Sequence, residues 1–128
     1  GFEGYIREHT IETGWTKEFV ANNLEQIEKF LQVRLPGIAP LENYLHFVLA
    51  RQGHDHTERL KNINAPTLIL VGDDENHGAT DNTHWAAAHQ LARAIPNAKL
   101  VVLQGEGHHY LATNPAAAHK AMREFIKS

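Results

Sequence analysis

Two short, uninterrupted apolar runs constrain the fold of this chain more than any other feature. They cover residues 68–71 and 100–103, and neither contains a polar residue. Such runs are typical of strands that are buried on both faces, as in parallel sheets. Between them apolar side chains recur at helical spacing until Pro96, which predicts a helix over residues 84–95. The order strand, helix, strand predicts an α/β fold with a right-handed crossover and both strand carboxyl ends at one edge of the sheet.

Titratable side chains follow both predicted strands. Asp73, Asp74 and Glu75 follow the first strand, and His108 and His109 follow the second. Ligands of open α/β sheets bind at the edge formed by the carboxyl ends of the strands. We therefore expect a carboxylate and an imidazole to face one another there, with His109 as the spare imidazole that points away.

The two loops resemble known sequence motifs. The letters GDDE at residues 72–75 resemble the acid motif of the C-terminal half of the α/β-hydrolase superfamily, and GEGH at residues 105–108 resembles its Gly-x-Gly-His motif. The resemblance covers residues 60–128, and residues 1–59 look like the helical cap segment that precedes that half. It implies a partial α/β-hydrolase fold, with two parallel strands, a crossover and C-terminal helices after the cap.

The same resemblance implies a role for each loop. His108 is the catalytic imidazole, and Glu75 or Asp74 is the acid that orients it. Spacing from the strand favours Glu75, whereas Asp74 is the commoner residue type for the role, so both remain candidates. Taken one at a time, the acidic cluster reads better as solvated or helix-capping charge and the histidine pair as a surface turn. We favour the catalytic interpretation because the predicted strands bring both loops to one edge.

The sequence lacks the nucleophile that this chemistry needs. In the α/β-hydrolases it lies on a Gly-x-Ser-x-Gly turn between a strand and a helix. The sole serine of this chain is Ser128, cysteine is absent, and no Gly-x-Asp-x-Gly variant occurs. We therefore expect the chain alone to be inactive as a serine hydrolase. At 128 residues, with Met122 as its only methionine, it looks like the C-terminal part of a longer enzyme.

The expected function is the hydrolysis of a small ester, lactone or carbon–carbon bond by that complete enzyme, with no metal or organic cofactor. The strand over residues 68–71 is expected to have an open edge, which is an aggregation liability unless another strand covers it. We expect another chain or a second copy of this one to do so. The alternative function is a non-catalytic α/β assembly module that dimerises through the open edge. A separate chain that carries Gly-x-Ser-x-Gly would favour the enzyme.

Composition excludes several classes of function. The net charge of −3 gives no electrostatic footprint for nucleic acid or an anionic membrane. The absence of cysteine excludes a disulfide framework and a Cys-type metal site. There is no signal peptide and no apolar run long enough to cross a bilayer, so we expect a cytoplasmic protein. His54 and His56 flank a carboxylate, but no third metal ligand follows at a recognisable spacing, and we interpret this segment as a solvated loop.

The sequence predicts helices in the first part of the chain, after an irregular start. Residues 1–15 have early glycines and no clean periodicity, and we interpret them as an irregular lead-in with at most a short helical turn. Thr16 is a suitable N-cap for one amphipathic helix whose apolar stripe runs from Val20 to Leu31. Pro40 marks the start of a second helix and Gly53 its end. Asn114 and Pro115 mark the start of a last helix.

Overall fold

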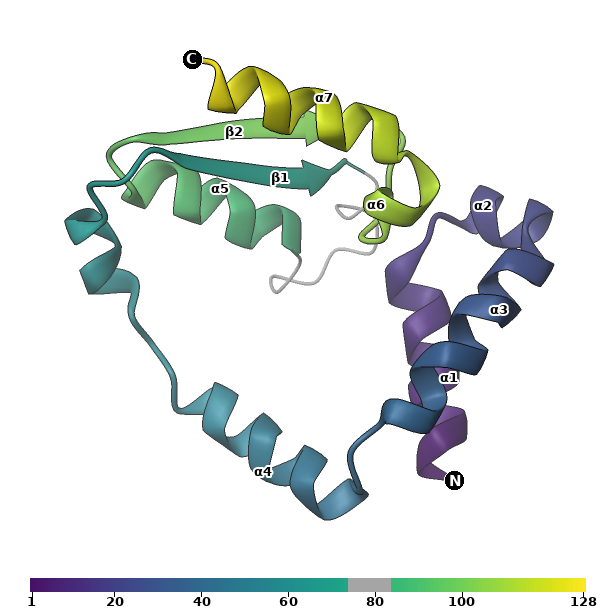
Figure 1. Ribbon diagram of the computed structural model, residues 1–128. Coiled ribbons are helices and arrows are strands. Elements are labelled where there is room, and N and C mark those ends of the chain that lie inside the picture. Colours follow the sequence, from purple (N-terminus) through teal and green to yellow (C-terminus); the bar gives the residue numbers. More distant parts are fainter. Residues whose placement is uncertain (74–83) are drawn as a thin grey trace. The chain divides into compact units, whose positions relative to one another are not determined.

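The computed structural model describes residues 1–73 and 84–128, and the chain divides into two compact units (Figure 1). The helical unit comprises Gly1–Glu12 and Lys17–His56, and the sheet unit comprises Thr13–Thr16 and Thr57–Ser128. The short segment Thr13–Thr16 therefore belongs to the sheet unit, although both of its neighbours in sequence belong to the helical unit. The division into a cap segment and a hydrolase core, drawn from the sequence at residue 59, stays a prediction.

The helical unit is built from four α-helices and one 3-10 turn in the part of the chain that the structure describes. Its small core contains Ile6, Ile27 and Leu31, of which Leu31 is completely buried. In neither unit does a described helix have the length and apolar character needed to cross a membrane. The elements are α1 (Phe2–Gly14), α2 (Lys17–Asn22), α3 (Leu24–Arg34), η1 (Leu35–Gly37) and α4 (Leu41–Gln52).

Helix α1 replaces the irregular lead-in that the sequence predicted over residues 1–15, so that prediction was wrong. Ile6 and Thr10 lie four residues apart and are both buried, which gives α1 an inward face. The sequence did not indicate this inward face, because one of its two buried residues is a threonine and not an apolar residue. Arg7 on the same helix forms a two-pronged ion pair with Glu28 of α3, with nitrogen–oxygen distances of 3.2 and 2.5 Å. These hydrogen bonds, together with the opposite charge, lower the pKa of Glu28 and raise that of Arg7.

A break at Asn23 divides the helix that was expected as one continuous element after Thr16 into α2 and α3. Asn23 has φ −136° and ψ 34°, which is not helical. The side-chain amides of Asn22 and Asn23 donate to the carbonyl oxygens of Glu18 and Phe19, at 2.9 and 3.0 Å. Asparagine side chains compete with the helix for backbone groups in this way, and here they end α2.

Helix α4 begins and ends as its proline and glycine predicted, with Pro40 at the N-cap and Gly53 at the C-cap. It has no buried residue. The ring of Tyr44 contacts that of Phe2 at the start of α1, with centroids 5.1 Å apart. Much of its apolar surface is left to solvent in this unit; its exposed large side chains are Leu41, Leu45, Phe47 and Leu49.

The sheet unit contains a parallel pair of strands, β1 (Thr67–Gly72) and β2 (Ala98–Leu103). Both coincide with the predicted apolar runs, extended by one or two residues, and their parallel pairing confirms the expected topology. Helix α5 (His84–Ala94) contacts both strands from one side of the sheet, and α7 (Pro115–Ile126) covers the other side (Figure 1). The strands are therefore covered on both faces, which explains why their sequences do not alternate with polar residues.

The core of the sheet unit lies between the strands and their helices. Ile69, Val71 and Ala88 are its buried centre, with Trp85 and Leu91 of α5 packed against it. Helix α7 begins as predicted: Pro115 is its first residue, and the side chain of the N-cap Asn114 accepts a hydrogen bond from the amide of Ala117 at 3.2 Å. The 3-10 turn η2 (Thr57–Asn62) precedes β1, and the one-turn helix α6 (Tyr110–Thr113) precedes α7.

Candidate functional site

The candidate site lies where β1 and β2 end side by side. Gly72 is paired with Leu103 at the ends of the two strands. The amide of Asp73 donates to the carbonyl of Leu103 at 3.1 Å, so the pairing continues one residue beyond β1. The loop that follows β1 and the histidine loop (residues 104–109) after β2 therefore leave the sheet from the same edge, as the sequence predicted.

Asp73 connects these two loops directly. Its carboxylate accepts a hydrogen bond from the amide of Gly105, with an N–O distance of 2.5 Å. Gly105 has φ +73°, a left-handed conformation that glycine adopts without steric cost. Asp73 thus fixes the first turn of the histidine loop, which is a structural role for this first member of the acidic cluster.

The end of β1 also packs on the backbone of the histidine loop. A side chain at Gly72 would collide with the carbonyl oxygen of Glu106, and it would approach that of Gly107 within 3.0 Å. Glycine is needed at position 72 for this close approach. The first glycine of the acid motif thus has a structural reason that is independent of catalysis.

Glu106 attaches the histidine loop to the start of α7. Its carboxylate accepts hydrogen bonds from the hydroxyl of Thr113 at 2.5 Å and from the side-chain amide of Asn114 at 2.9 Å. Because the oxygen of the same Asn114 amide caps α7, the carboxylate is linked to a rigid helix end. Sequence reasoning did not assign a role to Glu106; the only available signal was its place between the two glycines of the motif.

The side chain of His108 is exposed at this edge and stacks on a second imidazole. The rings of His108 and His84 are nearly parallel, with centroids 3.9 Å apart and an interplanar angle of 12°. His84 is the first residue of α5. Sequence reasoning missed this contact, although a crossover helix must begin at the edge where the preceding strand ends.

His109 occupies a different environment. Its Nε2 atom is buried, and its ring meets the indole of Trp15 edge to face, with centroids 4.4 Å apart. Its backbone amide donates to the carbonyl of Gly14 at 2.9 Å. The two neighbouring histidines therefore differ: the ring of His108 is presented at the surface, and that of His109 is built into the sheet unit.

The two acid candidates, Asp74 and Glu75, lie outside the described residues. The predicted approach of one of these carboxylates to His108 therefore remains a prediction. His54 and His56 are exposed and contact each other, with ring centroids 4.0 Å apart. Within the described residues there is no group of three or more metal-ligating side chains.

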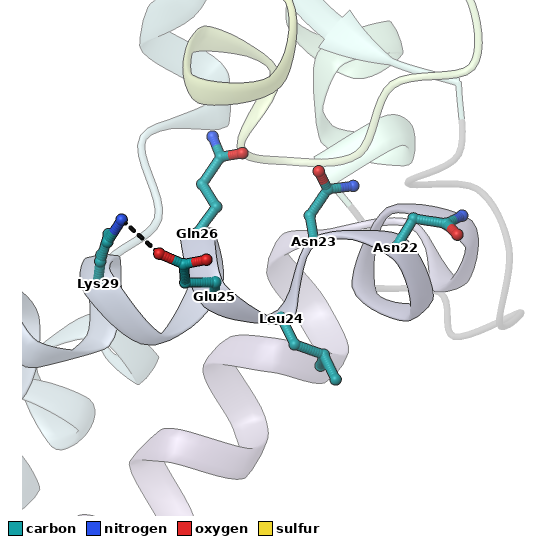
Figure 2. A pocket seen from close by; sticks show the side chains of 6 residues that line it. All are labelled: Asn22, Asn23, Leu24, Glu25, Gln26 and Lys29. Carbon is teal, nitrogen blue, oxygen red and sulfur yellow. Dashed lines mark hydrogen bonds and ion pairs between the residues drawn. The ribbon is translucent and has the colours of Figure 1, made fainter.

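A hollow of about 440 Å³ on the helical unit contains none of the candidate catalytic residues. Its charged side chains, Glu25 and Lys29, form an ion pair at 2.7 Å and largely neutralise each other (Figure 2). All of its lining comes from one stretch of chain around the break between α2 and α3. The six residues are Asn22, Asn23, Leu24, Glu25, Gln26 and Lys29 (Figure 2).

Comparison with known proteins places this architecture in a family. Residues 48–128, more than half of the chain, match the α/β-hydrolase family described as TAP-like protein. The chain belongs to the α/β-hydrolase superfamily. A thermophilic esterase from Thermogutta terrifontis has a similar structure, with a TM-score of 0.75 and 28% sequence identity over 98% of this chain and 44% of the esterase. Est816, described as an N-acyl homoserine lactone degrading enzyme, shares the fold at 22% identity, with a TM-score of 0.68 over 97% of this chain and 47% of that one.

The chain is also similar in sequence to curated proteins. A putative carbamate hydrolase, RutD of Pseudomonas syringae pv. syringae (strain B728a), is 31% identical over 87 residues, which are 68% of this chain and 32% of the relative. The non-heme chloroperoxidase CPO-A1 of Kitasatospora aureofaciens is 36% identical over 73 residues, which are 57% of this chain and 25% of that protein. The chain thus spans a third or less of the length of these curated relatives.

Proposed function

We propose that this α/β-hydrolase chain supplies the histidine and the acid of a Ser-His-acid triad, and that the complete enzyme hydrolyses a small ester, lactone or carbon–carbon bond. The observation that carries the proposal is the parallel pairing of β1 and β2 with matched ends. It brings Asp73, the first residue of the acidic cluster, next to the loop that carries His108. The exposed ring of His108, on a backbone fixed by Asp73 and Glu106, suits a proton carrier.

In this proposal His108 acts as a general base and then as a general acid. One ring nitrogen takes the proton of the nucleophile hydroxyl while the hydroxyl oxygen attacks the substrate carbonyl carbon, and the imidazolium gives that proton to the leaving group. A water molecule repeats the sequence to release the acyl group. Glu75 or Asp74 accepts a hydrogen bond from the other ring nitrogen and stabilises the imidazolium. Asp73 has a structural role in this proposal, because one oxygen of its carboxylate accepts the amide hydrogen of Gly105.

The substrate class is proposed from the proteins that this chain resembles. The similar solved structure at 28% identity is an esterase, and RutD is described as a putative carbamate hydrolase. Both descriptions refer to cleavage of an acyl bond to oxygen or nitrogen. In such reactions an imidazole transfers the proton and an acid orients the imidazole.

We propose that the partner of this chain is a polypeptide that carries the nucleophile and that pairs one of its strands with β1. In the described part of the chain the sheet has two strands, and β1 pairs with β2 along one of its edges. Both faces of β1 are covered by helices, as in an inner strand of a larger sheet. Its second edge would receive the partner strand. The same open edge supports the second candidate function, a non-catalytic module that dimerises there.

Hydrolysis of an activated ester such as p-nitrophenyl acetate tests the proposed function. The purified chain alone should give no turnover above buffer, because it contains no serine before Ser128 and no cysteine. Together with a polypeptide that carries Gly-x-Ser-x-Gly it should turn over, and His108→Ala should lower kcat by about 10³-fold or more. His119→Ala, which changes an exposed histidine of α7, is the matched control. Turnover that survives His108→Ala contradicts the proposal, and a self-sufficient dimer that needs no such polypeptide favours the assembly module.

A further inference from the structure

The segment Thr13–Thr16 packs on the histidine loop, far away in sequence. It belongs to the sheet unit, whereas the residues on either side of it belong to the helical unit. Trp15 at its centre is only 5% exposed. The buried tryptophan lies between the end of α1 at Gly14 and the start of α2 at Lys17, and its packing partners include the ring of His109, edge to face at 4.4 Å.

The contact involves the backbone of the histidine loop as well as this ring. His109 donates its amide hydrogen to the carbonyl of Gly14 at 2.9 Å. A side chain at Gly107 would lie 3.2 Å from the amide nitrogen of Thr16 and 3.3 Å from the carbonyl oxygen of Gly14. The two residues that flank His108 are therefore both in contact with the segment, one through its backbone and the other through backbone and ring.

Gly14 leaves room for the His109 ring. A side chain there would lie 2.6 Å from Cδ2 and 2.7 Å from Nε2 of His109, closer than real contacts allow. The ring is thus enclosed between a glycine that must stay small and a tryptophan that is buried. This enclosure fixes the backbone of His109, and with it the direction in which the preceding side chain leaves the loop.

We propose that Trp15 and His109 are positioning residues for His108: the enclosure of the His109 ring by Gly14 and Trp15 sets the orientation of the imidazole at the sheet edge. This inference rests on the proposed function, in which His108 carries the proton. Trp15 and His109 do not touch the reacting atoms in this proposal. They act through the backbone on either side of His108, where a displacement of about 1 Å can cost about 10²-fold in rate.

Two measurements test the inference. In the chain alone, the ring NMR signals of His108 should shift in Trp15→Ala and return toward their original positions in Trp15→Phe, which keeps an aromatic ring. In the active complex, Trp15→Ala and His109→Ala should lower kcat about 10-fold to 100-fold with little change in KM. Ile95→Ala, which removes buried volume after α5, at the end of the sheet where β2 begins, is the control for general loss of stability and should leave both readouts unchanged.

The outcomes separate this inference from the proposed function. If His108→Ala abolishes turnover while Trp15→Ala and His109→Ala leave kcat and the His108 signals unchanged, the positioning role is wrong and the proposed function stands. If Ile95→Ala lowers kcat as much as Trp15→Ala does, the effect is one of stability and the positioning role is again wrong. If His108→Ala leaves turnover intact, both proposals fail.

Discussion

Glu106 and His108 are two residues apart and have opposite surroundings. The carboxylate of Glu106 is partly buried and bound by two side chains at the start of α7, whereas the ring of His108 is exposed. Rigid backbone under an accessible side chain is what a catalytic group needs, because the reacting atom must be held in place without being covered. At the scale of single residues, the loop backbone around His108 is held by side-chain contacts, while the ring stays accessible and stacks on His84.

The hydrogen bonds of Glu106 predict a measurable loss of stability on substitution. Glu106→Ala leaves Thr113 and Asn114 without their carboxylate, and we expect the free energy of unfolding to fall by about 1–3 kcal/mol. Glu106→Gln keeps one acceptor oxygen and should lose less. Urea unfolding followed by circular dichroism measures both. Glu124→Ala, on the exposed side of α7, is the control; equal effects at positions 106 and 124 would contradict the assigned contacts.

The sequence predicts the position of His108 but not what surrounds it. Its place after an apolar strand and directly after the two glycines of the motif is a local pattern, and the structure has it at the expected edge. The contacts of Glu106 with Thr113 and of His109 with Gly14 depend on how the chain folds back, and no spacing rule predicts them. The contact of His84 with His108 was missed for another reason, because the position of His84 at the start of the crossover helix was not used.

At the scale of elements, prediction succeeded where one periodic pattern decided the structure. The two apolar runs became β1 and β2, and Pro40, Gly53 and Asn114 mark helix ends as expected. Prediction failed for α1, where the buried Thr10 hides the inward face. It also failed at the break between α2 and α3, because the apolar stripe continues across Asn23 although the side-chain amides interrupt the helix.

The pairing of α1 with α3 predicts a pH dependence for the helical unit. The hydrogen bonds from Arg7 lower the pKa of Glu28 in the folded state. The contribution of the pair to stability is therefore present above the pKa of Glu28 in the unfolded chain, about 4.5, and is lost as the pH falls through the lower folded value. The effect is small, because both side chains are substantially exposed.

An NMR titration of the Glu28 carboxyl carbon measures this effect. Its midpoint should lie below the ordinary value in the native chain and return toward about 4.5 in Arg7→Gln. A midpoint that is the same in both proteins would show that the ion pair does not persist in solution.

At the scale of the whole molecule, two surfaces predict self-association of the isolated chain. One is the second edge of β1, which no strand covers in the described part of the chain, and the other is the apolar surface of α4. We attribute it to the strand edge. Sedimentation velocity should show concentration-dependent association that the polypeptide with the nucleophile suppresses by forming a one-to-one complex. Phe47→Glu is the control, since it places a charge on the exposed surface of α4. Association that disappears with Phe47→Glu would assign it to α4, and a monodisperse monomer that unfolds cooperatively would contradict the prediction altogether.

The central claim is that one chain brings an acid and an imidazole together at the edge of a parallel sheet. A crystal structure of the chain in complex with the polypeptide that carries the nucleophile tests this claim most directly. We expect a carboxylate oxygen of Glu75 or Asp74 within about 2.6–3.2 Å of Nδ1 of His108, with Nε2 directed at the nucleophile. Both carboxylates in solvent, with the His108 ring turned away from the nucleophile, would contradict it.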